Sequence, residues 1–150
     1  MLAILMLFLG YVYGAGPSSS QAATASAASE AAERQYEKGV TLFREGDPDG
    51  AIQALKRAIE LNPRHDGAFH VMGRWNAEIM RLSSIERFFA KSFLGGAVFS
   101  QASWDNAVAY MKRAVDVRPE FIYHHYDLAL IYIDTKKWSL ARQQLELIPS

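Results

Sequence analysis

Four histidines are the residues of this sequence whose side chains could bind a metal ion. His124 and His125 are adjacent, and His65 and His70 flank an expected turn between two helices. Ligands that share one face of a helix are three or four residues apart, whereas adjacent side chains point in different directions. No aspartate or glutamate completes a recognisable ligand set around them. We therefore expect no metal site, and we interpret the histidines as surface or interface residues.

The sequence shows no signature of other catalytic chemistry. The glycine pair Gly95-Gly96 is expected to end a helix, since no phosphate-binding loop surrounds it. Ser83 is explained as a helix cap and Ser100 or Ser103 as the cap of the next helix, and none lies in a Gly-x-Ser-x-Gly turn. The chain has no cysteine, which excludes disulfides, thiolate zinc sites and thiol nucleophiles. We expect neither catalytic residues nor a cofactor, and therefore no enzyme.

Arg74 is the residue best suited to recognition of a partner. Its planar guanidinium can hold a carboxylate of a ligand through two hydrogen bonds. The alternative is a salt bridge within the chain, to Glu37 or to Asp127. The choice between the two depends on the helices that carry these residues.

Two spacings indicate a helical repeat into which a segment has been inserted. Several residue types recur after 34 residues, the period of the tetratricopeptide repeat (TPR): Gly39 and Gly73, Trp104 and Trp138, Ala107 and Ala141. Others recur after 56 residues: Ala51 and Ala107, Leu55 and Met111, Pro63 and Pro119. The difference predicts an insert of 22 residues between Gly73 and Trp104.

Each repeat is expected to be a pair of helices. In the first repeat the small residues Gly39 and Ala51 lie where the two helices cross. Between them, Gly46 suits a left-handed C-cap, Asp47 an N-cap, and Pro48 the first turn of the second helix. The predicted fold class is all-α, a TPR-like helical-hairpin solenoid of about three repeats, the second interrupted by an extra short helix. The expected segments are a signal peptide or N-terminal anchor at 1–15, a flexible Ser/Ala-rich spacer at 16–31, and a TPR domain at 32–150. Within the TPR domain, the repeats are expected at about 32–65, 66–121 and 122–150. The second repeat contains the insert at 77–103, and the third is truncated.

The insert is predicted to contain an amphipathic helix. Ser83 and Glu86 form a capping box at its start. Residues at helical spacing then give it an apolar stripe: Ile85, Phe88, Phe89, Ser92 and Phe93. The phenylalanines fill extra core beside the second repeat, line or cover a groove as a lid, or contact a membrane surface. Only Arg87 and Lys91 accompany them, fewer cations than a membrane-surface helix usually carries, so core packing is the preferred interpretation.

The first helices of a TPR array line a concave groove in which partners bind. Residues expected to face this groove are Tyr36, Glu37, Val40, Phe43, His70, Arg74, Tyr126, Asp127, Leu130 and Ile133. We expect a subset to contact a protein or peptide partner: Tyr36, Phe43, His70, Arg74, Tyr126 and Asp127. For Val40, Leu130 and Ile133, packing between the repeats is the competing interpretation.

The N-terminus carries an apolar run from Leu2 to Tyr13. It is shorter than the roughly 20 residues that a membrane span needs, and Val12-Tyr-Gly14 has small residues where a signal peptidase cleaves. No lysine or arginine precedes it. We expect export to the periplasm or the exterior after cleavage, with a membrane anchor at residues 2–13 as the alternative. The formal net charge of zero gives no basic field for nucleic acid.

Three segments around the insert are distinctive: His70-Val-Met-Gly-Arg-Trp75, Leu82-Ser-Ser-Ile-Glu86 and Ala90-Lys-Ser-Phe-Leu-Gly95. They resemble the regulator of microtubule dynamics family, which is similar in having TPR-like repeats interrupted after a Gly-Arg-Trp helix by a short Leu-Ser-x-Ile-Glu helix. The resemblance covers about residues 33–147 and implies a non-catalytic adaptor. Animal members are associated with microtubules and organelle contacts; this chain looks more like the bacterial members, so tubulin binding is not carried over. The motif residues are expected to define the fold at the insert: Gly73, Arg74, Trp75, Leu82, Ile85 and Glu86.

Two functions follow from these observations. The first is a protein-interaction module, an adaptor or scaffold that binds a peptide or a helix in the groove. The alternative is an assembly subunit that forms homo-oligomers through its uncapped C-terminal repeat, where Leu145, Leu147 and Ile148 have no obvious covering helix. In either case the N-terminal segment could tether the protein to a membrane.

Overall fold

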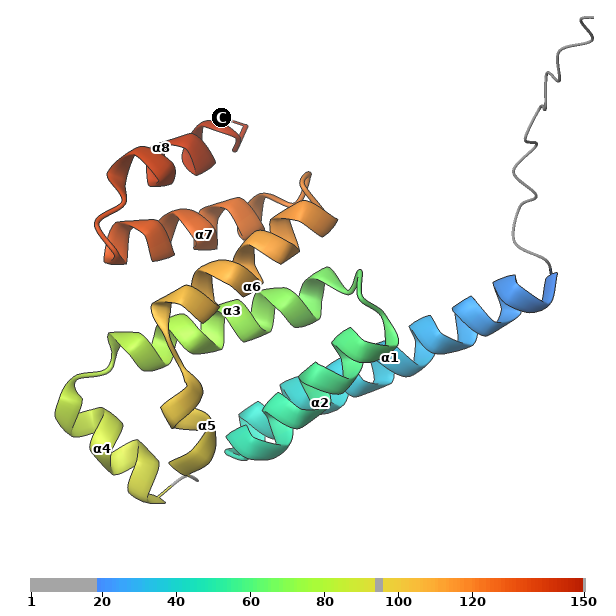
Figure 1. Ribbon diagram of the computed structural model, residues 1–150, viewed down its shortest axis with the longest axis horizontal. Helices are drawn as coiled ribbons and strands as arrows, with labels where there is room; N and C mark the ends of the chain where they lie inside the picture. Colours follow the sequence, from blue (N-terminus) through green and yellow to red (C-terminus); the bar gives the residue numbers. More distant parts are fainter. Residues whose placement is uncertain (1–18, 94–95, 150) are drawn as a thin grey trace, which may run out of the picture.

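The computed structural model describes residues 19–93 and 96–149, and within these ranges it consists of eight α-helices and no strands (Figure 1). The helices are α1 (Ser19–Glu45), α2 (Pro48–Leu61), α3 (Asp66–Arg81), α4 (Ser84–Phe93), α5 (Gly96–Gln101), α6 (Trp104–Val117), α7 (Ile122–Asp134) and α8 (Trp138–Glu146). The predicted all-α fold class is confirmed. The expected signal peptide or anchor at residues 1–15 lies outside the described residues.

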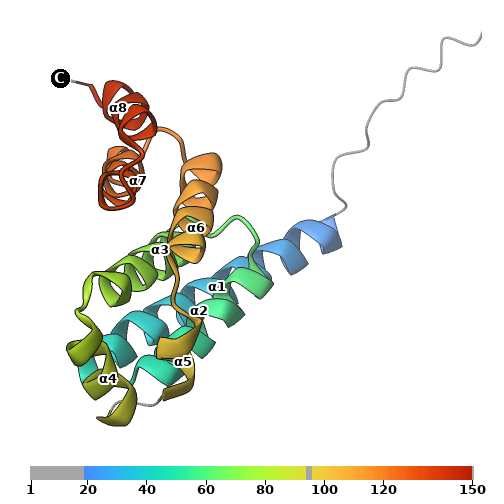
Figure 2. The same ribbon diagram turned by 60° about the vertical axis from the view of Figure 1, so that its left-hand side comes forward.

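Three antiparallel helix pairs stack into a solenoid (Figures 1 and 2). Helix α1 pairs with α2, α3 with α6, and α7 with α8, while α4 and α5 are inserted between the two helices of the second pair. The crossing points are alike: a Cβ on Gly39 would lie 2.9 Å from Leu55 Cγ, and one on Gly73 would lie 3.1 Å from Met111 N. Leu55 and Met111 are 56 residues apart, so the same contact recurs across the insert, as predicted.

The turn inside the first repeat has the predicted chemistry. Gly46 has a φ of 83°, a left-handed conformation that glycine adopts without a steric cost. Asp47 is the N-cap of α2, and its Oδ1 accepts a hydrogen bond from Gly50 N at 2.9 Å. Pro48 occupies the first turn of α2, where no backbone N–H is needed.

Buried apolar side chains form two adjoining groups. One group joins α2 and α3 and includes Leu55 and Met72, and the other joins α6, α7 and α8 and includes Met111 and Leu128. The partly buried Tyr110 packs against both groups, so the core is continuous along the stack. Each helix pair therefore buries its apolar face against the next pair, as expected for a solenoid.

The expected flexible spacer is wrong for the residues that the structure describes. Helix α1 begins at Ser19, so residues 19–31 extend it beyond the first repeat (Figure 1). Most of these residues are exposed, and Ala32 is the first fully buried residue of the helix. Alanine has the highest helix propensity, and the alanine-rich run continues a helix that the first repeat already nucleates.

The insert contains two short helices rather than one. Helix α3 continues to Arg81, and the capping box then starts α4: Ser83 N donates to Glu86 Oε2 at 2.8 Å, and Glu86 N donates to Ser83 Oγ at 3.2 Å. A second helix, α5, begins at Gly96, where we expected a helix only to end. Ser103, not Ser100, caps α6, since its Oγ accepts from Asn106 N.

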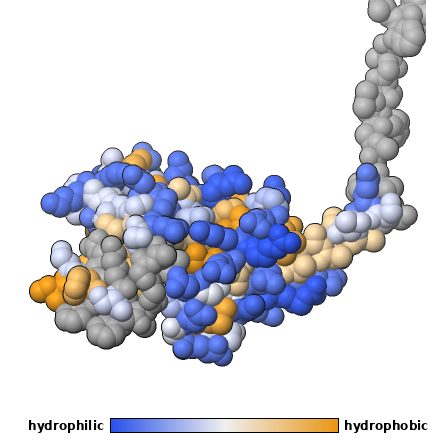
Figure 3. Space-filling view, turned by 60° about the horizontal axis from the view of Figure 1, so that its bottom comes forward, coloured by the Kyte–Doolittle hydropathy of each residue, from blue (hydrophilic) through white to orange (hydrophobic). Residues whose placement is uncertain are grey.

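The preferred interpretation of the insert's apolar residues, core packing, is wrong for Ile85 and Phe88. Their side chains are 70% and 66% exposed, and Figure 3 shows hydrophobic surface at the end of the molecule that α4 forms. The insert instead buries Phe99 of α5, whose ring lies 6.1 Å from that of Trp75. The side chains of Phe89 and Phe93 lie outside what the structure describes.

Buried Asn76 fixes the point where the chain returns from the insert. Its Oδ1 accepts a hydrogen bond from Ser103 N at 3.2 Å, and its Nδ2 donates to Met72 O at 2.8 Å. Among residues 19–93 and 96–149, none of the helices combines the length and the hydrophobicity that a membrane span needs.

Candidate binding groove

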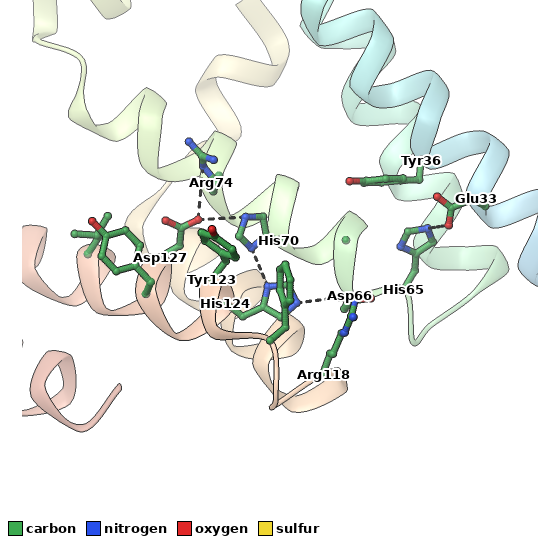
Figure 4. Close-up of a pocket in the computed structure, with 14 residues that line it drawn as sticks. Glu33, Tyr36, His65, Asp66, His70, Arg74, Arg118, Tyr123, His124 and Asp127 are labelled. Carbon is green, nitrogen blue, oxygen red and sulfur yellow. Dashed lines mark hydrogen bonds and ion pairs between the residues drawn. The ribbon is translucent and has the colours of Figure 1, made fainter. Parts of the chain in front are cut away.

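The first helices of the three repeats, α1, α3 and α7, border a pocket of about 730 Å³ (Figure 4). We call this pocket the groove. Its lining residues are Glu33, Tyr36, His65, Asp66, Gly67, His70, Arg74, Arg118, Phe121, Tyr123, His124, Tyr126, Asp127 and Leu130. The groove is therefore built from all three repeats, with side chains that are mainly aromatic or ionisable.

The structure brings together five of the six residues that we expected to contact a partner. Tyr36, His70, Arg74, Tyr126 and Asp127 all line the groove. The sixth, Phe43, lies in an adjoining hollow of about 540 Å³ that also includes Val40, Trp75 and Glu78, and His70 and Arg74 border both spaces. Leu130 lines the groove, whereas Glu37 and Ile133 border neither hollow.

Arg74 pairs with Asp127 and not with Glu37. Its Nε lies 3.7 Å from Asp127 Oδ2, and its side chain is 58% exposed. An ion pair at this exposure is worth little in stability, because water competes for both charges. The guanidinium therefore remains available to a ligand at the groove surface.

A chain of polar side chains crosses from α3 to α7 along the groove floor (Figure 4). Asp127 Oδ2 lies 3.2 Å from His70 Nε2, and His70 Nδ1 lies 2.9 Å from His124 Nδ1. His124 Nε2 in turn lies 3.0 Å from Asp66 Oδ2, which Arg118 Nη1 approaches at 3.6 Å. The chain joins the second repeat to the third.

Burial and hydrogen bonding shift the ionisation of this chain. The His124 side chain is only 1% exposed, and this burial lowers its pKa against the raising effect of the Asp66 hydrogen bond. Burial acts to raise the pKa of Asp66, but the hydrogen bond and charge of His124, together with Arg118, outweigh it and lower that pKa. The lowered pKa of His124 thus follows from its burial, and the lowered pKa of Asp66 follows from its contact with His124 and Arg118.

The first repeat contributes a second histidine contact to the groove. His65 is the N-cap of α3, and its Nδ1 accepts a hydrogen bond from Ala68 N at 3.2 Å. Its ring lies 4.8 Å from that of Tyr36, and its Nε2 lies 3.3 Å from Glu33 Oε2. Because Nδ1 accepts, Nε2 carries the proton of a neutral ring and faces the Glu33 carboxylate.

Several groove residues were not predicted from the sequence: Glu33, His65, Asp66, Arg118, Phe121, Tyr123 and His124. Asp66 and Tyr123 lie in the first turns of α3 and α7, directly after the turns that follow Pro63 and Pro119. The proline turns were visible in the sequence, so the first residues after them could have been included. The pairing of His70 with His124 had no such signal.

The groove presents hydrogen-bonding groups, charged groups and aromatic rings. Within the described part of the chain, no three histidine, aspartate or glutamate side chains are placed to hold a metal ion. The two carboxylates beside the histidines already have partners within the protein: Asp127 contacts His70, and Asp66 contacts His124. The exposed side chains of the groove include Glu33, Arg74, Arg118, Tyr123 and Tyr126.

Stacked helix pairs that enclose such a groove define a TPR domain, which is a protein-interaction module. The family model for the tetratricopeptide repeat matches residues 32–65, the first helix pair. The chain belongs to the regulator of microtubule dynamics protein 1-3 family, whose model matches residues 53–150. The predicted family resemblance is thus confirmed, and the match includes the insert.

A solved protein structure has a similar helical fold. The crystal structure of MamA is similar over 78% of this chain, with a TM-score of 0.55 and 21% sequence identity. The match spans 56% of the MamA chain, so this protein corresponds to about half of it. At this identity the likeness shows the helical-repeat fold. No curated protein matches the chain.

Proposed function

We propose that this protein is a non-catalytic adaptor that captures an extended peptide or a single helix of another protein in the groove. The observation that carries the proposal is the composition of the groove, since α1, α3 and α7 each contribute side chains to one continuous pocket. A ligand that follows the pocket would contact all three repeats. Binding would therefore depend on the stacking of the repeats.

Exposed tyrosines support this function. Tyr123 and Tyr126 are 59% and 48% exposed although both border the groove, and Tyr36 of α1 lines the same groove. Tyrosine and arginine are enriched where proteins bind one another, because they combine apolar area with hydrogen-bonding groups. The proposed contacts are Tyr36, Arg74 and Tyr126, one from each repeat along the groove.

The proposed setting is outside the cytoplasm. The apolar run at residues 2–13 and the small residues after it suit export with cleavage, and a retained membrane anchor is the alternative. Fractionation of the host, followed by intact mass of the protein, distinguishes the two. A soluble exported form beginning near Ala15 supports cleavage, whereas an uncleaved form in the membrane fraction supports the anchor.

The test of the groove is a triple substitution with a matched control. The test variant combines Tyr36→Ala, Arg74→Ala and Tyr126→Ala, and the control combines Lys56→Ala, Lys112→Ala and Arg142→Ala, exposed residues of the second helices. Immobilised protein captures partners from an envelope extract of the host, and mass spectrometry quantifies them. We expect the test variant to lose the partners that wild type and control share, with helicity and melting unchanged. Equal capture by all three proteins would exclude the groove.

A second candidate function is self-association through α8. Four apolar side chains on or next to this helix are exposed: Trp138 at 61%, Leu140 at 38%, Leu145 at 42% and Leu147 at 60%. A repeat normally covers such a face with its neighbour. Sedimentation tests this candidate: a monomer that is independent of concentration at micromolar levels excludes it, and a dimer that Leu145→Glu dissociates supports it.

A further inference from the structure

The junction of the second and third repeats contains two histidine rings that face each other. His70 on α3 and His124 on α7 approach through their Nδ1 atoms at 2.9 Å, and their ring centroids are 4.9 Å apart. We call these two residues the histidine pair. At this distance the two nitrogens form a hydrogen bond, so one of them must carry a proton and the other must not.

The partners on the outer sides of the rings fix the remaining protons. His70 Nε2 faces Asp127 and His124 Nε2 faces Asp66, at 3.2 and 3.0 Å. An ionised carboxylate only accepts hydrogen bonds, so each Nε2 carries a proton. The four ring nitrogens of the pair therefore hold three protons. The pair carries a single positive charge between two carboxylates.

The location of that charge follows from burial. His124 is 1% exposed, whereas the His70 side chain is 16% exposed and lies beside Asp127. Desolvation disfavours a charged ring, and it lowers the pKa of His124. The less buried ring, that of His70 beside Asp127, is thus the more favourable site for the charge.

Other ionisable groups around the pair come from every neighbouring element. Helix α3 contributes Asp66 and Arg74, and α7 contributes Tyr123, Tyr126 and Asp127. The segment between α6 and α7 contributes Arg118 and Glu120, and the first repeat contributes Glu33, Tyr36 and His65. The charges nearest the pair are the two carboxylates of Asp66 and Asp127, which also contact the guanidinium groups of Arg118 and Arg74. Arg118 is shared with Glu120 at 3.4 Å. The proton shared by the rings therefore lies between two carboxylates.

We propose that the histidine pair is a proton-operated latch that holds the third repeat against the second, so that the shape of the groove and its capture of a partner follow pH. The role in capture rests on the function proposed above; the latch itself does not. Loss of the shared proton at higher pH leaves two lone pairs facing each other. Gain of a second proton at lower pH leaves two N–H groups facing each other. The contact is favourable only between these limits.

A second contact between the same helices sits at the other end of α3 and α7. Arg81 Nε and Nη2 donate to Asp134 Oδ2 at 2.9 and 2.6 Å. Burial acts to lower the pKa of Arg81, but the hydrogen bond from Arg81 to Asp134 outweighs it, so that pKa is raised and the guanidinium stays charged. This ion pair holds one end of α7 while the latch holds the other. Release of the latch would therefore tilt α7 and change the width of the groove.

Nuclear magnetic resonance of the wild-type protein tests the latch without any ligand. The protein is labelled with ¹⁵N in its histidines, kept in chelator, and titrated from about pH 5 to 9, where histidines change charge. Near neutral pH we expect the ¹⁵N chemical shifts of both Nδ1 atoms to lie between those of a protonated and an unprotonated ring nitrogen. The two chemical shifts should change together on titration. Two rings that titrate independently, each in an ordinary tautomer, would overturn the proposal. His125 is the internal control, because its ring nitrogens contact Gln144 and Pro119 O instead.

Hydrogen exchange connects the latch to the repeats. In wild type we expect the protection of α7 and α8 amides, corrected for intrinsic exchange, to be highest in the pH range where the histidine pair shares one proton. Above and below that range the protection should fall about tenfold, while the protection of α1 and α2 amides stays unchanged. The double variant His70→Gln, His124→Gln can hydrogen-bond amide to amide without a titrating proton, and its protection should lose this pH dependence. Protection that is equally flat in wild type would refute the latch.

The two proposals fail separately. A shared proton and pH-dependent protection, with no loss of capture in the groove triple variant, would leave the latch intact and exclude the groove. Capture that depends on the groove but is equal at all pH values, with independent histidines, would exclude the latch alone.

Discussion

Asn76 Oδ1 accepts the backbone N–H of Ser103 at 3.2 Å, so one buried amide on α3 holds the chain where it returns from the insert. The contact spans 27 residues of sequence. It joins the two helices of the second repeat at the point where the insert separates them in sequence. The repeat can therefore keep its hairpin geometry although 22 extra residues interrupt it.

Asn76→Ala should lower the free energy of unfolding by about 2 kcal/mol, because it leaves Ser103 N and Met72 O without their buried partner. Urea unfolding followed by circular dichroism measures the change. Asn106→Ala is the matched control: its amide donates to Gln101 O on the exposed surface, and we expect less than about 0.5 kcal/mol. Equal effects of the two substitutions would contradict the role of Asn76.

Gly73→Ala should also destabilise the protein. A Cβ at this position would lie 3.1 Å from Met111 N and 3.3 Å from Ala107 O, and a backbone cannot move aside as a side chain can. Overpacking of this kind costs about 1–3 kcal/mol, which exceeds the roughly 1 kcal/mol that alanine gains in helix propensity. Thermal melting measures the result.

The control for Gly73 is Gly67→Ala in the same helix. There a Cβ would meet only the ring of Tyr36, at 3.3 Å, and that ring lies at the groove. We expect melting within a few degrees of wild type. A Gly73→Ala variant as stable as this control would show that the two helices of the second repeat can separate without cost.

Phe99 and Phe88 should differ sharply in their contribution to stability. Phe99→Ala removes a ring that is 5% exposed and packs against Trp75, which costs about 3–4 kcal/mol. Phe88→Ala removes a ring that is 66% exposed, and the free energy of unfolding should change little. Urea unfolding of both variants measures the difference in their free energies of unfolding. If Phe88→Ala were the more harmful, the insert would pack through α4 rather than α5.

Stability should fall on acidification in two ranges. His124 has a pKa below its ordinary 6.5, so the unfolded chain takes up its proton first and the folded state loses stability as the pH falls below about 6.5. Asp66 has a pKa below its ordinary 3.8, and its protonation in the unfolded chain lowers stability again below about pH 4. Urea unfolding at pH 7, 5.5, 4 and 3 measures both ranges.

Asp66→Asn tests the assignment of these ranges. It removes the titrating carboxylate next to His124 and Arg118, so the loss of stability below about pH 4 should shrink. At pH 7 the variant should be less stable than wild type, since Arg118 loses the carboxylate that it pairs with and the hydrogen bond from His124 loses its charged acceptor. If the variant lost as much stability as wild type below about pH 4, other carboxylates would be responsible for that loss.

The repeat architecture was predictable because equivalent residues recur at fixed spacings in the sequence. Gly39 and Gly73 on the first helices and Ala51 and Ala107 on the second are small where two helices touch, so their recurrence gave both the period and the length of the insert. The turn at Gly46 and the cap at Asp47 were predictable for the same reason, since each acts within four residues of sequence.

The latch and the insert's packing were not predictable in this way. His70 and His124 are 54 residues apart, and their contact depends on how two helix pairs stack. The apolar stripe of α4 correctly gave a helix but not the direction of its face, because α5 fills the space beside Trp75 instead. The Ser/Ala-rich composition of residues 19–31 predicts a flexible spacer, yet the adjoining helix extends through them.

The extension of α1 is a helical arm that projects beyond the first repeat. At a rise of about 1.5 Å per residue, residues 19–31 span about 20 Å, so anything attached at Ser19 stands off from the groove by that length. The length of the arm also sets the rotation of the groove about the helix axis, relative to the attachment point at Ser19. One residue added to the exposed stretch would turn the groove by about 100° relative to the attachment point, while seven would nearly restore its direction at a greater distance. The length of this helix thus controls the direction in which the groove faces.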